Sequence, residues 1–415
     1  MISFVLDLVN IISIIFLLII LSYYCLLFIR KKKMARGKVP RSISIIIPAH
    51  NEEKYIADCI ESVLKADFDG KKEVVVIDDG SKDRTARIAQ GYPVRLLRNA
   101  HHGKSASINK ALRISNGELV AVVDADSVIA EDSLKEAARF FSDKRVGGVC
   151  SIIRVKNRRT FPGMWLHIEQ LYNSLLRSLF AKVNVNIVTP GPLSIYRREH
   201  LNKIGDFETR GFSEDVDVAV RLIKAGYKVE CSEKSISETN MPITIKGFSR
   251  QRLRFARGWI NIFKRHFRLN RTAMRIYTLP LMLFGYFQAV IMGSIMLYNI
   301  ISGYMTYFVS QGTAFSLGAL RFFVEWLSIA GIIRWCARLI SGSEPWTIIA
   351  AIGLGASLLT YPLYLVAIFK YDKRLSWRHI IPLIFMFPYW LIIMIFYIIG
   401  LPEAFRKHQN NKWEK

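Results

Sequence analysis

Apolar residues are concentrated at the two ends of the 415-residue chain. Residues 2–29 are almost wholly apolar, and this run exceeds the ~20 residues that span a bilayer. The C-terminal part has comparable runs at 277–301, 346–369 and 379–401. A further run at 320–340 carries four charged residues, so it either crosses within a bundle or lies at the interface. We expect an N-terminal anchor and three or four C-terminal transmembrane helices.

Between these ends, residues 41–271 have the pattern of a globular domain, in which short β-branched runs alternate with amphipathic segments. We expect strands at 42–47, 73–77, 94–97 and 119–123, and helices at 52–65, 83–90 and 104–115. Such alternation predicts an α/β fold with a mainly parallel sheet. Ligands of these sheets bind beyond the carboxyl ends of the strands, where several aspartates of this sequence stand.

The chain has a formal net charge of +25. A nucleic-acid-binding protein is one explanation. The basic residues, however, gather beside apolar runs, as in residues 30–33, which is typical of the cytosolic flanks of membrane proteins. A cleaved signal peptide fits the first run poorly, because no basic residues precede it and no small-residue cleavage site follows. We expect a multi-pass protein of the cell membrane with a cytosolic central domain and no nucleic-acid partner.

Five cysteines are scattered along the chain, and none of them form a CxxC pair. A disulfide partner and a zinc site are therefore not expected. A reducing cytosol suits the central domain.

Two carboxylates, Asp124 and Asp126, follow directly after the apolar run 119–123. With one residue between them, both can reach one divalent cation. Mg2+ and Mn2+ prefer oxygen ligands and often share them with substrate phosphates. The alternative interpretation is a solvated turn after a strand, which the motif alone leaves open.

Three more polar segments have both a chemical and a structural interpretation. Asp78 and Asp79 end a strand, where they can bind a nucleotide or cap the next helix. Glu214 and Asp215 fall in the first turn of a helix, where they serve as a general base or only favour the helix dipole. Lys104 follows a glycine at a helix start, which suits a diphosphate.

A basic and aromatic segment follows around residue 250, in which Phe255 and Trp259 stand one helical turn apart among several arginines. An amphipathic helix at the membrane surface explains this pattern without any catalysis. The other interpretation is that an arginine pairs with phosphate while an aromatic ring stacks on a sugar.

Taken in order, these segments resemble the membrane-bound family 2 glycosyltransferases, which include hyaluronan, chitin, cellulose and poly-N-acetylglucosamine synthases. The resemblance runs from residue 44 to about residue 259, and the poly-N-acetylglucosamine synthases are the most similar group. It rests on Pro48-Ala49-His50-Asn51-Glu52, Asp78-Asp79-Gly80-Ser81, Gly103-Lys104, Asp124-Ala125-Asp126, Thr189-Pro190-Gly191-Pro192, Tyr196-Arg197-Arg198, Ser213-Glu214-Asp215 and Gln251-Arg252-Leu253-Arg254. Where the family has QxxRW, this sequence has Phe255 in the tryptophan position.

The resemblance implies a GT-A-like α/β domain joined to an α-helical transmembrane bundle. It implies an inverting transfer from a nucleotide-diphosphate sugar, UDP-linked in most of these relatives, with Mg2+ or Mn2+ as cofactor. By the same resemblance, Asp215 is the general base with Glu214 beside it, and Asp124 and Asp126 hold the metal. The residues implied to bind the donor are Pro48, Asn51, Glu52, Asp78, Asp79, Lys104, Asp124, Asp126, Gln251 and Arg254. Those implied at the acceptor are Gly191, Pro192, Phe255 and Trp259.

These expectations divide the chain into an anchor (1–30), a GT-A domain (41–245), interface helices with the QxxRF motif (246–272), a transmembrane bundle (273–402) and a basic tail (403–415). The expected function is processive transfer to a growing β-linked polysaccharide, which is exported through the membrane segments. The alternative is a single transfer to a polyprenyl phosphate or another lipid. A non-catalytic transporter or scaffold is a third hypothesis, which the carboxylates argue against.

Overall fold

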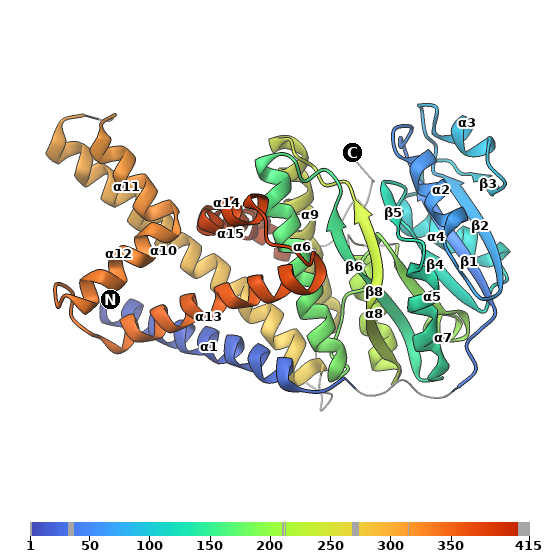
Figure 1. Cartoon of the computed structure of the whole chain (residues 1–415), viewed down its shortest axis with the longest axis horizontal. Coiled ribbons are helices and arrows are strands. Elements are labelled where there is room, and N and C mark those ends of the chain that lie inside the picture. The colour runs from blue at the N-terminus through green and yellow to red at the C-terminus, as the bar shows by residue number, and fades with distance from the viewer. Residues whose placement is uncertain are drawn as a thin grey trace.

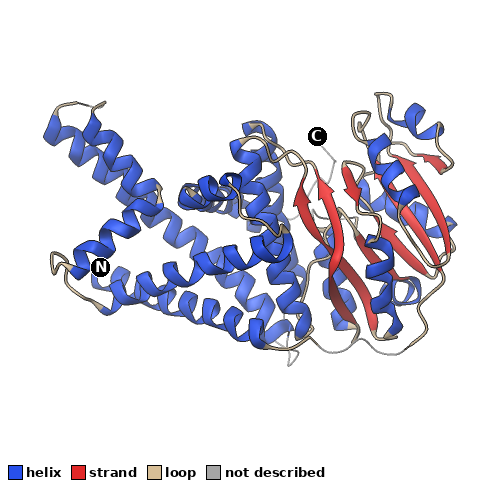
Figure 2. Ribbon diagram, in the orientation of Figure 1, coloured by secondary structure: helices blue, strands red, loops and turns tan. Residues whose placement is uncertain are grey.

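The computed structural model describes residues 2–31, 37–209, 211, 213–267, 274–313 and 315–405. Part of the basic flank 30–33 and most of the expected basic tail therefore lie outside the described residues. Figures 1 and 2 show two halves, with the strands and their covering helices at one end and the long helices at the other. The N-terminus lies at the far end of the helical half (Figure 1).

The strands of the described residues form one eight-stranded sheet in the order β3-β2-β1-β4-β7-β6-β8-β5. Their bounds are β1 (Ser42–Ala49), β2 (Lys71–Asp78), β3 (Arg95–Arg98), β4 (Leu119–Val122), β5 (Ser127–Ile129), β6 (Val146–Val155), β7 (Ser194–Arg197) and β8 (Lys228–Thr239). From β3 to β4 the strands are parallel, as expected. The rest is mixed, because β7 runs antiparallel to β4 and β6, while β8 is parallel to β6 and antiparallel to β5.

The central strand β1 is buried on both faces, which explains its near-continuous apolar sequence. The chain then turns at Asn51, whose φ of 54° lies in the left-handed region that asparagine tolerates. A tight turn in which the Tyr55 N–H donates to the Glu52 carbonyl follows. The next helix therefore begins at Ile56, four residues later than the sequence pattern predicts.

The helices of the half that contains the sheet are α2 (Ile56–Lys65), α3 (Thr85–Gln90), α4 (Lys104–Ile114), α5 (Ser133–Ala138), α6 (Phe161–Lys182), α7 (Arg198–Ile204), α8 (Glu214–Lys224) and α9 (Ile245–His266). Those of the other half are α1 (Ile2–Phe28), α10 (Leu279–Gln311), α11 (Leu317–Leu327), α12 (Ile329–Ile340), α13 (Ile348–Tyr371), α14 (Trp377–Ile384) and α15 (Met386–Gly400). Three segments of the described residues are long and apolar enough to cross a membrane: Asp7–Phe28, Ile276–Ser310 and Ala351–Tyr371. A fourth is possible if α14 and α15, bent by 60°, count as one span.

The charged run at 320–340 is not one helix, because the chain breaks at Ser328 between α11 and α12. Neither helix is long enough to span a bilayer by itself. Glu325 pairs with Arg321 and Arg334, so these charges offset one another. By length and composition, the described C-terminal part offers two candidate spans, or three with the bent pair.

Two helices of the half that contains the sheet, α6 and α9, lie between the sheet and the long apolar helices (Figure 1). A buried ion pair joins them, because Arg252 of α9 donates to both carboxylate oxygens of Glu169 in α6, at 2.7 and 2.6 Å. The same guanidinium donates to the Tyr389 hydroxyl of α15 at 3.0 Å. Arg252 and Glu169 are each about 6% exposed at the side chain. One guanidinium therefore holds together three helices that are far apart in sequence.

We predict that Glu169→Ala lowers the free energy of unfolding by about 3–5 kcal/mol, because it leaves Arg252 buried without a counter-charge. Thermal or denaturant unfolding of the detergent-solubilised protein measures this. The double variant Glu169→Leu/Arg252→Met should recover most of the loss, since it removes both buried charges. A single-variant loss as small as that of a surface pair, below about 1 kcal/mol, would contradict the assignment.

Candidate functional site

A cavity of about 1460 Å³ lies between the sheet and the apolar helices. Eleven of the expected site residues line it: Lys104, Asp124, Asp126, Gly191, Pro192, Glu214, Asp215, Gln251, Arg254, Phe255 and Trp259. Residues of α1, α10, α13 and α15 line the same cavity on its other side. The structure thus gathers motifs spread over more than 150 residues and places them beside the candidate membrane spans.

A single lysine bridges two of the acidic motifs. Lys104 begins α4, and its Nζ lies 2.7 Å from Asp124 Oδ1 and 3.1 Å from Glu214 Oε1. Burial alone would lower the pKa of Lys104, but these two carboxylates raise it above its ordinary value. The lysine is therefore a firmly charged ammonium that offsets part of the negative charge in the cavity.

The DxD motif lies close to another backbone segment. The Asp124 N–H donates to the Gly191 carbonyl at 3.0 Å, and a Cβ on Gly191 would lie 2.2 Å from Asp124 Oδ2. Any residue other than glycine at position 191 would therefore displace the Asp124 carboxylate. Asp126 is held by Ser127 and Thr239, and burial, followed by the charge of Asp124, raises its pKa to about 6.

These two carboxylates fit a divalent cation. They offer hard oxygen donors in one cavity, which Mg2+ and Mn2+ prefer. Burial and then the neighbouring charge of Asp124 raise the pKa of Asp126, and a bound cation would offset both effects. The donor set and its charge therefore agree with the expected cofactor.

Asp215 stands in the first turn of α8, where the chain enters the cavity. Its backbone carbonyl accepts a hydrogen bond from Thr189 Oγ1 at 2.8 Å, and Tyr196 donates to the same hydroxyl at 2.8 Å. Burial, followed by the charge of Glu214, raises the pKa of Asp215 to about 7. For Glu214 burial acts in the same direction, but Lys104 outweighs it and lowers the pKa. Two adjacent carboxylates thus differ in proton affinity.

Five expected donor residues do not line this cavity: Pro48, Asn51, Glu52, Asp78 and Asp79. The fully buried Asp79 accepts hydrogen bonds from the His102 and Gly103 backbone N–H groups, at 2.9 and 2.8 Å, and from Ser107. Burial would raise the pKa of Asp79, but these bonds lower it. Asp79 therefore orders the loop that precedes Lys104.

Two more of these five residues, Asn51 and Glu52, connect the ends of two strands. Asn51 donates its N–H to Ser81 Oγ and accepts from the Lys82 N–H, both at 2.9 Å. The Glu52 N–H donates to Thr85 Oγ1 at 2.7 Å. These bonds hold the ends of β1 and β2 side by side next to the loop that carries Lys104.

Helix α9 contributes the aromatic and amide groups of the cavity. Phe255 is 37% exposed, with the guanidinium carbons of Arg252 and Arg254 at 5.7 and 5.6 Å from its ring centre. Trp259 instead packs against the core and stacks on Phe263 at 5.8 Å between ring centres. The buried Gln251 Oε1 has no partner among the described residues. Phe255 is thus the open ring of the pair, and Gln251 has an acceptor free for a ligand.

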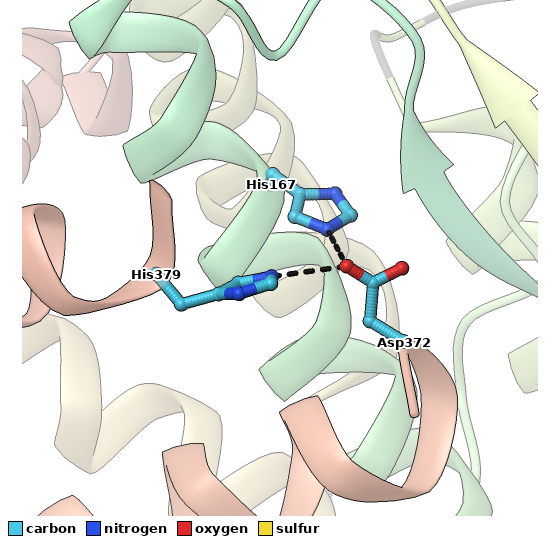
Figure 3. Close-up of side chains that lie close together, drawn as sticks. All are labelled: His167, Asp372 and His379. Atoms are coloured by element: carbon cyan, nitrogen blue, oxygen red, sulfur yellow. Dashed lines mark hydrogen bonds and ion pairs between the residues drawn. The ribbon is translucent and has the colours of Figure 1, made fainter. Parts of the chain in front are cut away.

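A second group of metal-type side chains, His167, Asp372 and His379, lies at the boundary between the two halves (Figure 3). The two Nε2 atoms lie 3.2 and 3.0 Å from Asp372 Oδ2. Each Nδ1 accepts a backbone N–H, which favours a proton on Nε2. The Nε2 of His167 also lies 2.9 Å from Nη1 of Arg158. Arg158 adds a charged donor at 3.1 Å. The group is therefore an ion-paired joint, since a metal would need the Nε2 lone pairs.

Sequence reasoning missed the residues that hold α8 in place. Asp217 accepts from His266 Nε2 at 2.8 Å and from Arg221 Nε at 2.7 Å, and it is 2% exposed. Burial would raise the pKa of Asp217, but these partners lower it to about 2. The Arg221 pair has i, i+4 spacing and was visible in the sequence; the His266 contact from α9 was not.

Residues 44–205 match the family model described as glycosyl transferase family 2. These residues are therefore similar to a family 2 glycosyltransferase domain, which agrees with the resemblance drawn from the sequence motifs. The solved mannosyltransferase PcManGT from Pyrobaculum calidifontis, in complex with GDP-Man and Mn2+, has a TM-score of 0.59 and 21% identity, covering 97% of this chain and 100% of that chain. By this similarity, a GT-A-like fold together with the helical half accounts for nearly the whole chain.

Two curated relatives match the catalytic half. An N-acetylglucosaminyltransferase of Mesorhizobium japonicum is 32% identical over 236 residues, which are 52% of this chain and 55% of the relative. A poly-beta-1,6-N-acetyl-D-glucosamine synthase of Staphylococcus epidermidis is 26% identical over 255 residues, which are 58% of this chain and 61% of the relative. The matched part spans little more than half of each relative.

We predict that the stability of the wild-type protein falls as the pH rises through 7, because the folded state holds a proton on Asp215 that the unfolded chain, with an ordinary pKa of 3.8, releases. Asp215→Asn cannot lose this proton, so its unfolding temperature should fall less over the same pH range. Thermal unfolding below and above pH 7 measures the difference. Equal pH dependence of the two proteins would mean that Asp215 titrates normally.

Proposed function

We propose that this protein transfers a sugar, with inversion, from a nucleotide-diphosphate sugar to an acceptor that reaches the cavity from the membrane side. One observation carries the proposal: Asp124, Asp126, Glu214 and Asp215 share one cavity with the candidate spans. The family 2 domain and relatives named N-acetylglucosaminyltransferase support it. UDP-N-acetylglucosamine is therefore the first donor to test.

In the proposed reaction Asp215 removes the proton from an acceptor hydroxyl. The hydroxyl oxygen attacks the anomeric carbon from the face opposite to the leaving group, which inverts that centre. The bond from carbon to the diphosphate oxygen breaks, and the nucleoside diphosphate leaves with the electron pair. Raising the pKa of Asp215 to about 7 places it where a base can both take and release a proton near neutral pH.

Asp124 and Asp126 are the residues that would hold Mg2+ or Mn2+. The cation would offset negative charge on the departing diphosphate. Lys104 and Arg254 line the same cavity and supply further positive charge on the side of the leaving group. Gly191 and Pro192, which crowd Asp124, would form one wall of the acceptor path.

The acceptor divides the proposal into two candidates. Relatives named poly-beta-1,6-N-acetyl-D-glucosamine synthase favour a growing β-linked glycan, made processively and exported through the helical half. The cavity wall favours a lipid acceptor, because its membrane side is largely apolar. That wall includes Ile12, Phe16, Leu281, Phe284, Met292, Met296, Ile393 and Met394. A polyprenyl chain needs no hydrogen-bonding partners, so these side chains suit it. The helical half also supplies polar groups that suit a glycan: Tyr286, Gln288, Tyr361, Tyr364 and Tyr397.

The proposed orientation places the catalytic half in the cytosol, where nucleotide sugars are made. The basic residues 30–33 directly after the first apolar run support this, since cytosolic flanks carry an excess of Lys and Arg. The protein would then be a multi-pass component of the cell membrane that presents its cavity to the bilayer from the inner side.

We predict that exhaustive chelation abolishes sugar transfer and that Mg2+ or Mn2+ restores it. Asp124→Asn and Asp126→Asn should each weaken donor binding as well as rate, because both carboxylates serve the diphosphate end of the donor. Titration of the purified protein with UDP-N-acetylglucosamine, with and without metal, measures binding apart from turnover. Full turnover after chelation would contradict the metal assignment.

We predict that the product distinguishes the two acceptors: a long polymer for a synthase, or a lipid heavier by one sugar for a single transfer. Phe255→Ala should shorten a polymer while hydrolysis of the donor persists, since Phe255 is the open ring of the cavity. Phe255→Trp should be tolerated, and Asp215→Asn, as the inactive control, should lose ~10²–10⁴-fold in rate. Product of normal length from Phe255→Ala would leave α9 as a purely structural element.

A further inference from the structure

The cavity contains a second buried arginine, which differs from Arg252 in having no counter-ion. Arg177 of α6 is 6% exposed and lines the cavity. Among the described residues it has no ion pair, its Nε has no hydrogen-bond partner, and one terminal nitrogen donates to Ser174 Oγ at 2.7 Å. Arg252, equally buried on the same cavity, has both oxygens of Glu169.

An unpaired guanidinium in such a place is costly, because a buried charge loses its hydration without gaining a partner. Groups that interact electrostatically with Arg177 include the thiols of Cys150 and Cys231, which are paired in register across β6 and β8. A hydrogen bond from Cys231, and then the charge of Arg177, lower the pKa of Cys150 to about 7. A thiol is only a partial and diffuse counter-charge, so the site is built for an anion that comes from outside the chain.

The surroundings of Arg177 indicate which anion fits. The amide side chains of Gln170, Asn173 and Asn186 line the same cavity. Nδ2 of Asn186 donates one hydrogen bond to Cys150 Sγ at 3.6 Å and has a second N–H. Five residues further along α6, Lys182 donates to two carbonyl oxygens in the last turn of α1, at 2.8 and 3.1 Å. Arg177 lies about 7.5 Å along the helix from this point. It therefore lies close to the end of the first apolar helix.

From Arg177 the cavity continues along apolar side chains of α1 and α10, among them Ile12, Phe16, Met292 and Met296. A ligand that fills this space needs an anionic head at one end and an apolar chain at the other. Arginine donates two parallel hydrogen bonds to phosphate, and amides complete the coordination of its oxygens. A phosphate-bearing membrane lipid meets both requirements.

We propose that Arg177, with Asn173 and Asn186, binds the phosphate group of a membrane lipid whose chain lies in the apolar part of the cavity. The site rests on the proposed placement of the apolar helices in the bilayer. It does not depend on whether the transferred sugar goes to a glycan or to a lipid, because Arg177, Asn173 and Asn186 have no part in the proposed reaction. The lipid is either the acceptor itself or a permanent occupant beside the acceptor path.

The test uses the full-length protein in a maltoside detergent, which carries no phosphate. Three probes are compared by thermal unfolding and by equilibrium binding: undecaprenyl phosphate, the neutral undecaprenol with the same chain, and inorganic phosphate, which is the head alone. Undecaprenyl phosphate should stabilise the wild type clearly more than either other probe. Equal stabilisation by undecaprenol, or by inorganic phosphate at the same concentration, would overturn the proposal.

Arg177→Gln should weaken binding of undecaprenyl phosphate by roughly tenfold or more, the effect of losing charge-assisted hydrogen bonds. Arg177→Lys should keep part of it, and Arg113→Gln, at a guanidinium that is 73% exposed, should change nothing. Without lipid, Arg177→Gln should be at least as stable as the wild type, because it removes an unpaired buried charge. A less stable variant that still binds the lipid normally would mean that Arg177 has only a structural role.

Two further measurements keep the proposal testable. If Arg177→Gln does not fold, Asn186→Ala takes its place, with the comparison of the three probes on the wild type unaffected. Asp215→Asn should bind undecaprenyl phosphate as the wild type does, although it transfers no sugar. Loss of transfer with intact lipid binding therefore separates a failure of the proposed function from a failure of this site.

Discussion

Negative charge crowded into one buried cavity governs the catalytic half of this protein. Asp124, Asp126, Glu214 and Asp215 line the same space, and Lys104 bridges two of them. Burial, followed by the charge of a neighbouring carboxylate, raises the pKa values of Asp126 and Asp215 to about 6 and 7. The surrounding hydrogen bonds hold these groups in position. Asp79 fixes the loop that precedes Lys104, and the bonds of Thr189 and Tyr196 fix the first turn of α8. A site of this kind is strained until cations enter it.

The second constraint is the layer made by α6 and α9. These helices must pack against a sheet on one side and apolar helices on the other, so both are amphipathic and both bury charged groups. Glu169 offsets the charge of Arg252 with two hydrogen bonds, and Asp372 pairs with Arg158 and contacts the imidazole of His167. The contacts of Arg252 with Tyr389 and of His167 with Asp372 link the two halves, so polar contacts as well as apolar packing position the helical half against the sheet.

Local pattern was enough to predict β1 to β4 and the ordered acidic motifs, because each strand and each strand end shows in consecutive residues. It could not predict the antiparallel β7 or the edge strand β5, since pairing across a sheet depends on partners far away in sequence. Asp79 shows the same limit: its sequence position suits a nucleotide, but its carboxylate is taken by the loop at 102–107. The Glu169–Arg252 contact joins residues 83 apart, so no local signal announces it.

The two walls of the cavity come from different parts of the chain. The carboxylates and Lys104 belong to residues 104–215, whereas the opposite wall comes from α1 and from helices after residue 278. Substitutions in one wall therefore do not change the residues that form the other wall. Selection can exchange the helical wall, and with it the molecule that receives the sugar, while the machinery that activates the sugar stays the same. A fold divided in this way is open to diversification by replacement of one half.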